Sequence, residues 1–414
     1  MKRIAVPSRR WFENEERELL FPDRWQVDNL TSPGLEKPAL TPNDIRACIE
    51  HPVAGPPLTE LAKGKKQAVI VFDDMTRPTP TRDVVPHVLD GLHRAGLSKQ
   101  QIRFLWALGT HGTYDMINAR KKLGDDVVEQ YAVYNHDAFQ NTVYVGRTQT
   151  GVDLWFNRGF MECDLKIGIG CITAHIHVGF GGGAKLIMPG VAGIETVVQF
   201  HNQMYRDPSR TGLGNFDDNI MRAECDAAGD RAGLNFKVDC LINRRGEITS
   251  LYAGDFRSTH ARGAEEGKAH YGIPHATGYD IAILNTYGKA NEAAIALMFA
   301  PLTLTPSVGT AVLIADAPEG QVPHYVWGAW GPGHGGRHYI PRAEGFVRAL
   351  GKQLIVLTPH PDPTSLHWFC HINDATVVKT WPEVLSILDS DYPGPARVAV
   401  VQDGTMQYMQ RPGA

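Results

Sequence analysis

The sequence predicts an α/β protein of two α/β domains with mainly parallel sheets and an active site in the cleft between them. Its 414 residues are more than one ordinary domain holds. Residues 67–72 form a continuous apolar run bounded by polar residues, which is typical of a strand buried in a parallel sheet. Similar runs alternate with helical patterns in both halves of the chain, which favours parallel sheets covered by helices.

A loop with Gly and Pro near residues 273–279 marks the expected boundary between the domains. We predict an N-terminal cofactor-binding and catalytic domain over residues 1–272. A C-terminal α/β domain over residues 273–414 is expected to complete the substrate site. The last strand of the chain could pack back on the N-terminal domain.

The individual elements follow from the apolar patterns. Residues 1–66 are Pro-rich and predict an irregular lead-in with one hairpin and one helix. The strands expected in the first half are 67–72, 102–108, 131–134, 142–146, 164–170, 236–242 and 247–252, the last two forming a hairpin. Its main expected helices carry Val84, Val88 and Leu92, and then Ile194, Val197, Val198 and His201. The second half predicts strands at 281–284, 311–315, 354–357, 376–379 and 397–402, with helices at 292–299, 341–350 and 382–389.

Composition excludes several classes of function. The net charge is −4 with both signs mixed along the chain, so neither nucleic acid nor an anionic membrane surface is an expected partner. No apolar run approaches the roughly 20 residues that span a bilayer. The N-terminal segment lacks the apolar core of a signal peptide, and the six cysteines form no CxxC pair. We therefore expect reduced thiols and a cytoplasmic protein.

The segment from Cys171 to Lys185 is the most informative part of the chain. It holds His175 and His177, followed by four glycines within the five positions 179–183. Glycines allow positive φ and close backbone approach, and the exposed N–H groups suit an anion such as phosphate. Lys185 could reach that ligand or act as a nucleophile. The segment is not a Walker A loop, because the lysine lacks a preceding Gly and a following hydroxyl, and no G-x-G-x-x-G fingerprint opens the first half.

Two further polar segments follow predicted strands. Residues 74–80 (DMTRPTP) place Asp74 and Arg77 at a strand end, where the guanidinium suits a carboxylate or phosphate or else only shapes the loop. His111 lies between glycines in GTHG and is a candidate general base, although a structural histidine fits equally well. Because ligands bind at the carboxyl ends of parallel strands, these segments and the glycine-rich run are expected to converge.

The remaining histidines are weaker signals. His175 and His177 would point to opposite faces of an extended strand, so one of them is expected to be structural. His201 lies on the following helix, sixteen residues beyond Lys185. In the second half, residues 327–339 combine Trp, His and Arg with glycines, as in a substrate-facing loop or lid, or in a hairpin packed by tryptophans.

Taken in order, these segments resemble the nickel-pincer lactate racemase family. The motifs that carry the resemblance are D-x-T-R-P-T-P, G-T-H, H-x9-K and the histidine sixteen residues further on, within the first 270 residues. The resemblance implies a racemase or epimerase that inverts C2 of a 2-hydroxy acid. It also implies loading by cofactor-biosynthesis enzymes and hydride transfer between C2 and the cofactor, with a histidine acting at each face of the substrate.

The resemblance assigns roles to particular residues. Lys185 matches the lysine attached covalently to the nickel-pincer nucleotide (nickel pyridinium-3,5-bisthiocarboxylic acid mononucleotide), and His201 matches the nickel ligand. His111 and His175 match the catalytic histidines, and Arg77 is the expected partner of the substrate carboxylate. The residues expected to contact the cofactor are Asp74, Thr76, Gly181, Gly182 and Gly183.

One region departs from the family. The lactate enzymes carry a Tyr-Gln pair and a Lys in the helix after the first C-terminal strand, whereas residues 285–295 have no such pair. Tyr287, Lys289 and Trp330 are the candidates to contact the substrate instead. We therefore expect a 2-hydroxy acid larger or more polar than lactate, such as an aldonate or an aromatic hydroxy acid.

Two other classes of function remain open. A metal-dependent hydrolase or lyase could use His175-x-His177 without the pincer cofactor. A binding protein could have kept the fold and lost the cofactor. Against the second stand the two histidines together with the lysine, since a protein that only binds has no need of an acid or base on each face.

Overall fold

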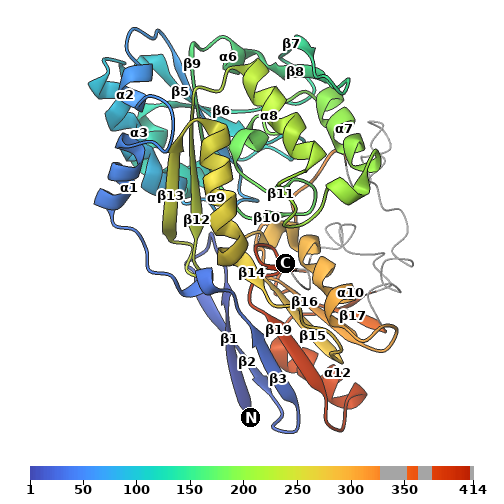
Figure 1. Cartoon of the computed structure of the whole chain (residues 1–414). Coiled ribbons are helices and arrows are strands. Elements are labelled where there is room, and N and C mark those ends of the chain that lie inside the picture. The colour runs from blue at the N-terminus through green and yellow to red at the C-terminus, as the bar shows by residue number, and fades with distance from the viewer. Residues whose placement is uncertain (327–351, 362–374, 411–414) are drawn as a thin grey trace.

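The computed structural model describes residues 1–326, 352–361 and 375–410, which form two six-stranded sheets and four two-stranded ones (Figure 1). The first large sheet has the order β13-β12-β9-β4-β5-β6. Its strands are β4 (Ala68–Asp73), β5 (Ile102–Ala107), β6 (Ala132–Asn135), β9 (Leu165–Cys171), β12 (Phe236–Ile242) and β13 (Ile248–Gly254). Neighbours are parallel except for the β12–β13 hairpin. The predicted mainly parallel α/β class is confirmed.

The second large sheet is entirely parallel, with the order β18-β17-β16-β15-β19-β3. Its strands are β3 (Gln26–Leu30), β15 (Ile281–Thr286), β16 (Thr310–Ala315), β17 (Gln353–Leu357), β18 (Thr376–Val378) and β19 (Arg397–Val401). The small sheets pair β1 (Lys2–Ser8) with β2 (Glu15–Phe21), β7 (Thr142–Arg147) with β8 (Asp153–Asn157), β10 (Ala174–His175) with β11 (Gly179–Phe180), and β14 (Gly272–Ile273) with β20 (Tyr408–Met409).

Helices cover the sheets. The α-helices are α1 (Pro42–Glu50), α2 (Leu58–Leu61), α3 (Thr81–Arg94), α4 (Met116–Leu123), α5 (Asp125–Gln130), α6 (Arg158–Met161), α7 (Ile194–Asn202), α8 (Ile220–Ala232), α9 (Phe256–Tyr271), α10 (Ala300–Thr303) and α12 (Trp381–Asp391). The 3₁₀ helices are η1 (Pro33–Glu36), η2 (Lys99–Gln101), η3 (Gly183–Leu186), η4 (Gln203–Tyr205), η5 (Pro208–Arg210) and η6 (Ala290–Phe299). None of the helices in the described ranges is both long and apolar enough to cross a membrane.

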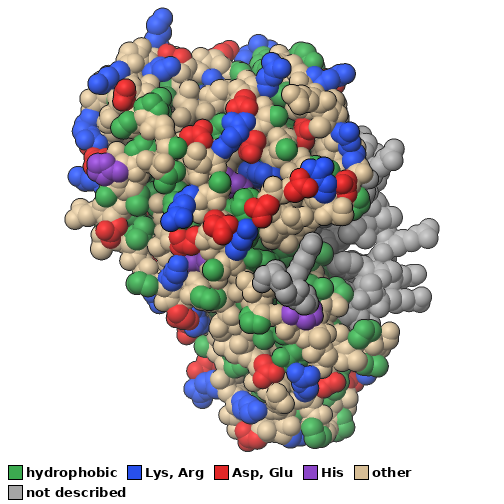
Figure 2. Space-filling model, viewed as in Figure 1, with side chains coloured by type: hydrophobic (Ala, Val, Ile, Leu, Met, Phe, Trp, Pro, Cys, Tyr) green, Lys and Arg blue, Asp and Glu red, His purple; other side chains and the backbone are tan. Residues whose placement is uncertain are grey.

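The continuous apolar runs are explained by burial on both faces of each sheet. In β4, Val69 and Val71 pack in the cluster that contains α8, while Ile70 and Phe72 pack in the cluster that contains α3. The alternation follows from the two-residue period of a strand. β15 behaves likewise, with one face against η6 and the other against α12. On the molecular face that Figure 2 shows, basic and acidic side chains are interspersed.

Three sequence expectations need correction or fall outside the described residues. The lead-in contains more than one hairpin and one helix, because β3 joins the second sheet beside β19 and α2 is a further short helix. The helix expected at 292–299 is the 3₁₀ helix η6, in which Glu292 has non-helical angles (φ −123°, ψ 40°). The helix expected at 341–350 lies outside the described residues, and the division at residue 272 stays a prediction.

The order of the strands determines where the loops that follow β4, β9 and β15 lie in the two sheets. In the first sheet the chain continues from β4 to β5 on one side, whereas β9 lies on the other side of β4. In the second sheet it continues from β15 to β16, whereas β19 lies on the other side of β15. Each sheet therefore has a topological switch point, where the loops diverge and leave room for a ligand. The loops after β4 and β9 and the loop after β15 lie at these points.

Because β15 packs against η6, we expect this contact to contribute to the free energy of unfolding. Leu284 is fully buried on the face of β15 that contacts η6, so Leu284→Ala is expected to cost about 2–5 kcal/mol of unfolding free energy. Leu302→Ala is the matched control, because that side chain is 43% exposed and its loss should change stability by less than about 0.5 kcal/mol. Urea unfolding of both variants measures the difference, and equal shifts in midpoint would contradict this packing.

Candidate active site

The described loops line a cavity, partly open to solvent, at the carboxyl ends of the strands. Its lining comes from the loops after β4, β5 and β9 and from α7. Two separate stretches of the second half also contribute, one with Glu292 and one with His324. Most of the residues singled out in the sequence line it: Asp74, Thr76, Arg77, His111, His175, Gly181, Gly182, Lys185 and His201. The expected convergence of the strand-end segments is therefore observed.

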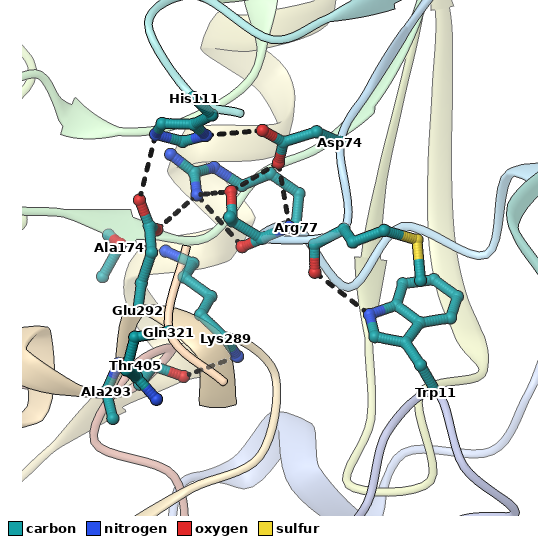
Figure 3. Close-up of polar contacts among 12 residues, drawn as sticks. Trp11, Asp74, Arg77, His111, Ala174, Lys289, Glu292, Ala293, Gln321 and Thr405 are labelled. Atoms are coloured by element: carbon teal, nitrogen blue, oxygen red, sulfur yellow. Dashed lines mark hydrogen bonds and ion pairs between the residues drawn. The ribbon is translucent and has the colours of Figure 1, made fainter. Parts of the chain in front are cut away.

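Asp74 holds two of these loops together (Figure 3). Its Oδ1 accepts hydrogen bonds from the backbone N–H and the hydroxyl of Thr76, at 2.8 and 2.5 Å. Its Oδ2 lies 2.5 Å from Nδ1 of His111. Burial alone would raise the pKa of Asp74, but His111, Arg77 and Thr76 together lower it, so the group is a carboxylate. A carboxylate only accepts, so His111 carries its proton on Nδ1 and the neutral ring has its lone pair on Nε2.

Arg77 is paired with Glu292, which the sequence analysis missed. The Nη1 atom of Arg77 donates to Glu292 Oε2 at 2.5 Å and to the Thr76 hydroxyl at 2.7 Å. Burial alone would lower the pKa of Arg77, but the carboxylates of Glu292 and Asp74 raise it. The other Glu292 oxygen lies 3.5 Å from Nε2 of His111. The His111 ring thus lies between the carboxylates of Asp74 and Glu292.

His175 is held in the opposite tautomer. Its Nδ1 accepts hydrogen bonds from the backbone N–H groups of His177 and Val178, at 3.1 and 3.4 Å, so the ring hydrogen is on Nε2. Burial, followed by the charge of Lys185, lowers its pKa well below the usual value, and the ring is neutral. The chain turns between β10 and β11, so the rings of His175 and His177 lie 5.7 Å apart rather than on opposite faces.

A row of histidine rings follows one side of the cavity. The ring centres are 5.8 Å apart from His177 to His201, 6.2 Å from His201 to His324 and 5.0 Å from His324 to His111. His201 donates from Nδ1 to the carbonyl of Val197 at 2.8 Å, which places the lone pair of the neutral ring on Nε2, as a metal ligand requires. Within the described ranges, no group of three or more His, Cys, Asp or Glu side chains is arranged to hold a metal ion.

The glycine-rich loop meets the cavity at Gly181 and Gly182. Gly182 has φ +83°, and a Cβ there would lie 2.7 Å from Ile172 and 2.9 Å from an Asp239 oxygen, so no other residue fits. Gly183, which was expected to contact the cofactor, is not among the cavity-lining residues, and its N–H donates to Asp239 at 2.8 Å. Burial, followed by the charge of Arg77, lowers the pKa of Lys185 to about 7, which makes its amine partly neutral near physiological pH.

The substrate residues predicted in the second half that the structure describes are not found among the residues that line the cavity. Lys289 is buried behind the cavity, where its ammonium donates to the carbonyl of Ala174 at 3.2 Å, next to His175. Tyr287 donates from its hydroxyl to Asn14 at 3.0 Å and is not among the cavity-lining residues. Trp330 lies outside the described residues. Lys289 can therefore position His175, whereas the described residues of the second half that line the cavity are Glu292, Ile295 and His324.

These features define an enzyme-type site: switch-point loops line a cavity that holds acid–base groups, a low-pKa lysine and a partly buried guanidinium. Residues 12–212 match the family model described as the lactate racemase N-terminal domain. Over these residues the chain is therefore similar to the lactate racemase family.

Two curated relatives support this similarity. The chain is 30% identical over 225 residues to lactate racemase of Thermoanaerobacterium thermosaccharolyticum, covering 53% of this chain and 52% of the relative. It is 28% identical over 283 residues to lactate racemase of Lactiplantibacillus plantarum, covering 67% and 66%. The chain thus spans between half and two thirds of the length of these relatives.

Solved structures support the fold over a longer range. The lactate racemase apoprotein of T. thermosaccharolyticum has a TM-score of 0.76 at 23% identity, covering 99% of this chain and 100% of that one. A Thermotoga maritima protein has a TM-score of 0.66 at 17% identity, covering 92% and 100%. At these identities the likeness concerns the fold.

The low pKa of Lys185 predicts unusual amine reactivity in the apoprotein. Acylation of Lys185 should rise through about pH 7 and level off near pH 8, because the neutral amine is already the main form there. Lys268 is the internal control: partial burial alone would lower its pKa, but hydrogen bonds to Glu265 and Asp217 raise it, so its labelling should keep rising to about pH 10. Peptide mass spectrometry measures both. Parallel curves for the two lysines would show that the cavity does not perturb Lys185.

Proposed function

We propose that this chain is a racemase or epimerase that inverts C2 of a 2-hydroxy acid, with a nickel-pincer nucleotide attached to Lys185. The observation that carries the proposal is the pair His111 and His175, held in opposite tautomers on one cavity with Arg77 and Lys185. We further propose a cytoplasmic protein loaded by cofactor-biosynthesis enzymes, with a small-molecule substrate as its other partner.

The residues present fit such a cofactor. Lys185, with a pKa of about 7, offers a nucleophilic amine for a covalent bond. Gly181 and Gly182 line the cavity, where the absence of a side chain lets a ligand approach the backbone closely. His201 offers one imidazole lone pair, and nickel accepts imidazole readily. One protein ligand suffices when the cofactor supplies the other donors, in accord with the absence of a three-residue metal site among the described residues. When bound, the group supplies an acceptor for the C2 hydrogen as hydride.

The side chains of the chain do the remaining work. Arg77 binds the substrate carboxylate through two charge-assisted hydrogen bonds from its guanidinium and so orients C2. His111 takes the hydroxyl proton at Nε2, while Asp74 stabilises the resulting imidazolium through Nδ1. His175, neutral with hydrogen on Nε2, donates a hydrogen bond to the substrate oxygen. To accept a proton at Nε2 instead, its ring must move the hydrogen to Nδ1 and give up two backbone hydrogen bonds.

The metal-dependent hydrolase or lyase has less support. Such a site built on His175-x-His177 needs a third protein ligand, and the described residues supply none. Nδ1 of His175 is also engaged by the backbone. A binding protein without catalysis would gain nothing from a lysine held near neutrality beside two oriented histidines.

Co-expression with the cofactor pathway tests the attachment. The loaded protein should bind nickel and carry a mass increment on the Lys185 peptide. Lys185→Ala should lose the increment, whereas His201→Ala should keep it and lose nickel, because the two residues hold different parts of the group. Elemental analysis and peptide mass spectrometry measure these outcomes. A wild-type protein that inverts a 2-hydroxy acid with neither nickel nor increment would refute the proposal.

The fate of the C2 hydrogen tests the reaction. A substrate deuterated at C2 should keep its label after inversion in ordinary water and should react about 2- to 5-fold more slowly than the protiated acid, because the hydrogen moves as hydride in the slow step. His111→Asn should lose at least about 100-fold in rate, the usual contribution of a general base. Mass spectrometry and chiral chromatography follow label and configuration. Loss of the label to solvent would instead indicate removal of a C2 proton.

A further inference from the structure

Glu292 is the described acidic side chain of the second half that enters the cavity, and the proposed reaction gives it no role. It is 6% exposed and paired with Arg77. Every side-chain hydrogen bond of Arg77 within the described ranges comes from Nη1: to Glu292, to the Thr76 hydroxyl and to the Thr76 carbonyl. The Nε and Nη2 edge of the guanidinium is left for a second carboxylate. Substrate and Glu292 can therefore share Arg77.

The position of Glu292 is fixed by several contacts. Its non-helical angles (φ −123°, ψ 40°) break the helical path of η6 at that residue and turn its side chain toward Arg77. Its N–H donates to the carbonyl of Lys289 at 2.8 Å. The side chain of Gln321 spans the same turn, accepting from the N–H of Ala293 and donating to the carbonyl of Ala290, both at 2.9 Å. A side chain held in this way acts as a fixed part of the site (Figure 3).

The fixed carboxylate borders the reacting atoms. Its Oε1 lies 3.5 Å from Nε2 of His111, the atom that would take the C2 hydroxyl proton. A substrate bound by carboxylate to Arg77 and by hydroxyl to His111 therefore presents the atoms attached to C3 near Glu292. An apolar group there removes water from a buried anion and offers no hydrogen bond, which is costly. A hydroxyl there donates a charge-assisted hydrogen bond.

We infer that Glu292 selects 2-hydroxy acids that carry a hydroxyl on C3, an inference that rests on the proposed function. Oε2 of Glu292 is paired with Arg77, so a substrate without that hydroxyl leaves Oε1 desolvated and without a donor, which rejects the wrong substrate strongly. The inference gives a structural reason for a substrate more polar than lactate. It assigns selectivity to a residue 215 positions along the chain from Arg77.

Lactate and glycerate test this directly, because they differ only by the C3 hydroxyl. The wild-type apoprotein should bind glycerate about 100-fold more tightly than lactate in calorimetry, and the loaded enzyme should show a similar ratio of kcat/KM for inversion. Glu292→Leu should reduce both ratios to within a few fold of one. Glu319→Gln is the matched control: Glu319 pairs with Lys121, does not line the cavity, and its loss should leave the ratios unchanged.

The outcomes separate the inference from the proposed function. An unchanged ratio in Glu292→Leu, or equal tightening of both acids, would overturn the inference; the second result would mean that Glu292 only competes for Arg77. If Glu292→Leu fails to fold, Glu292→Gln gives the same test with an uncharged side chain, and its ratio should fall at least about 10-fold. Selective glycerate binding without inversion by the nickel-loaded protein would refute the racemase and leave the selectivity of Glu292 intact.

Discussion

The buried carboxylate of Asp74 is the constraint on which the site depends. An anion that is 2% exposed must be compensated by donors, and here they come from its own loop through Thr76 and from the next strand's loop through His111. Satisfying Asp74 therefore fixes the distance between the two loops and the tautomer of the histidine together. Arg77 extends the network to Glu292, so both sheets contribute to one set of compensated charges.

Two buried cation–anion pairs lie beneath this network. Lys122 is fully buried, pairs with Asp73 at 2.8 Å and donates to the carbonyls of Asp74 and Arg77, so it holds the loop from below. Lys237 pairs with Asp239, whose other oxygen accepts the N–H of Gly183. Removing one partner of such a pair typically costs about 3–5 kcal/mol, because a buried charge is left alone. Buried ion pairs, as well as apolar packing, therefore keep the loops that carry the reactive groups rigid.

The sequence allowed prediction of whatever is local. Apolar runs located the strands, and the rule that ligands bind at strand ends brought His111, His175 and Lys185 to one place. Glu292 was not predicted as a site residue, because its partner Arg77 lies far away in sequence and because it occurs in the apolar pattern of a helix. The strand β3 was not predicted, because only part of its short sequence is apolar. The turn between His175 and His177 could not be predicted, because two strand residues on either side give too little pattern. One of these histidines was expected to be structural, but the turn brings both to the cavity.

The pairing of β3 with β19 has a consequence for how the chain folds. β19 lies between β15 and β3, so residues 26–30 find their neighbour only after residues 397–401 have been synthesised. Contacts of such sequence separation slow folding, because a long loop must close before they form. Until then the early strand has an unpaired edge, which is prone to pairing with other chains. A fragment cut near residue 272 would keep that edge permanently, so the first half is better studied within the whole chain.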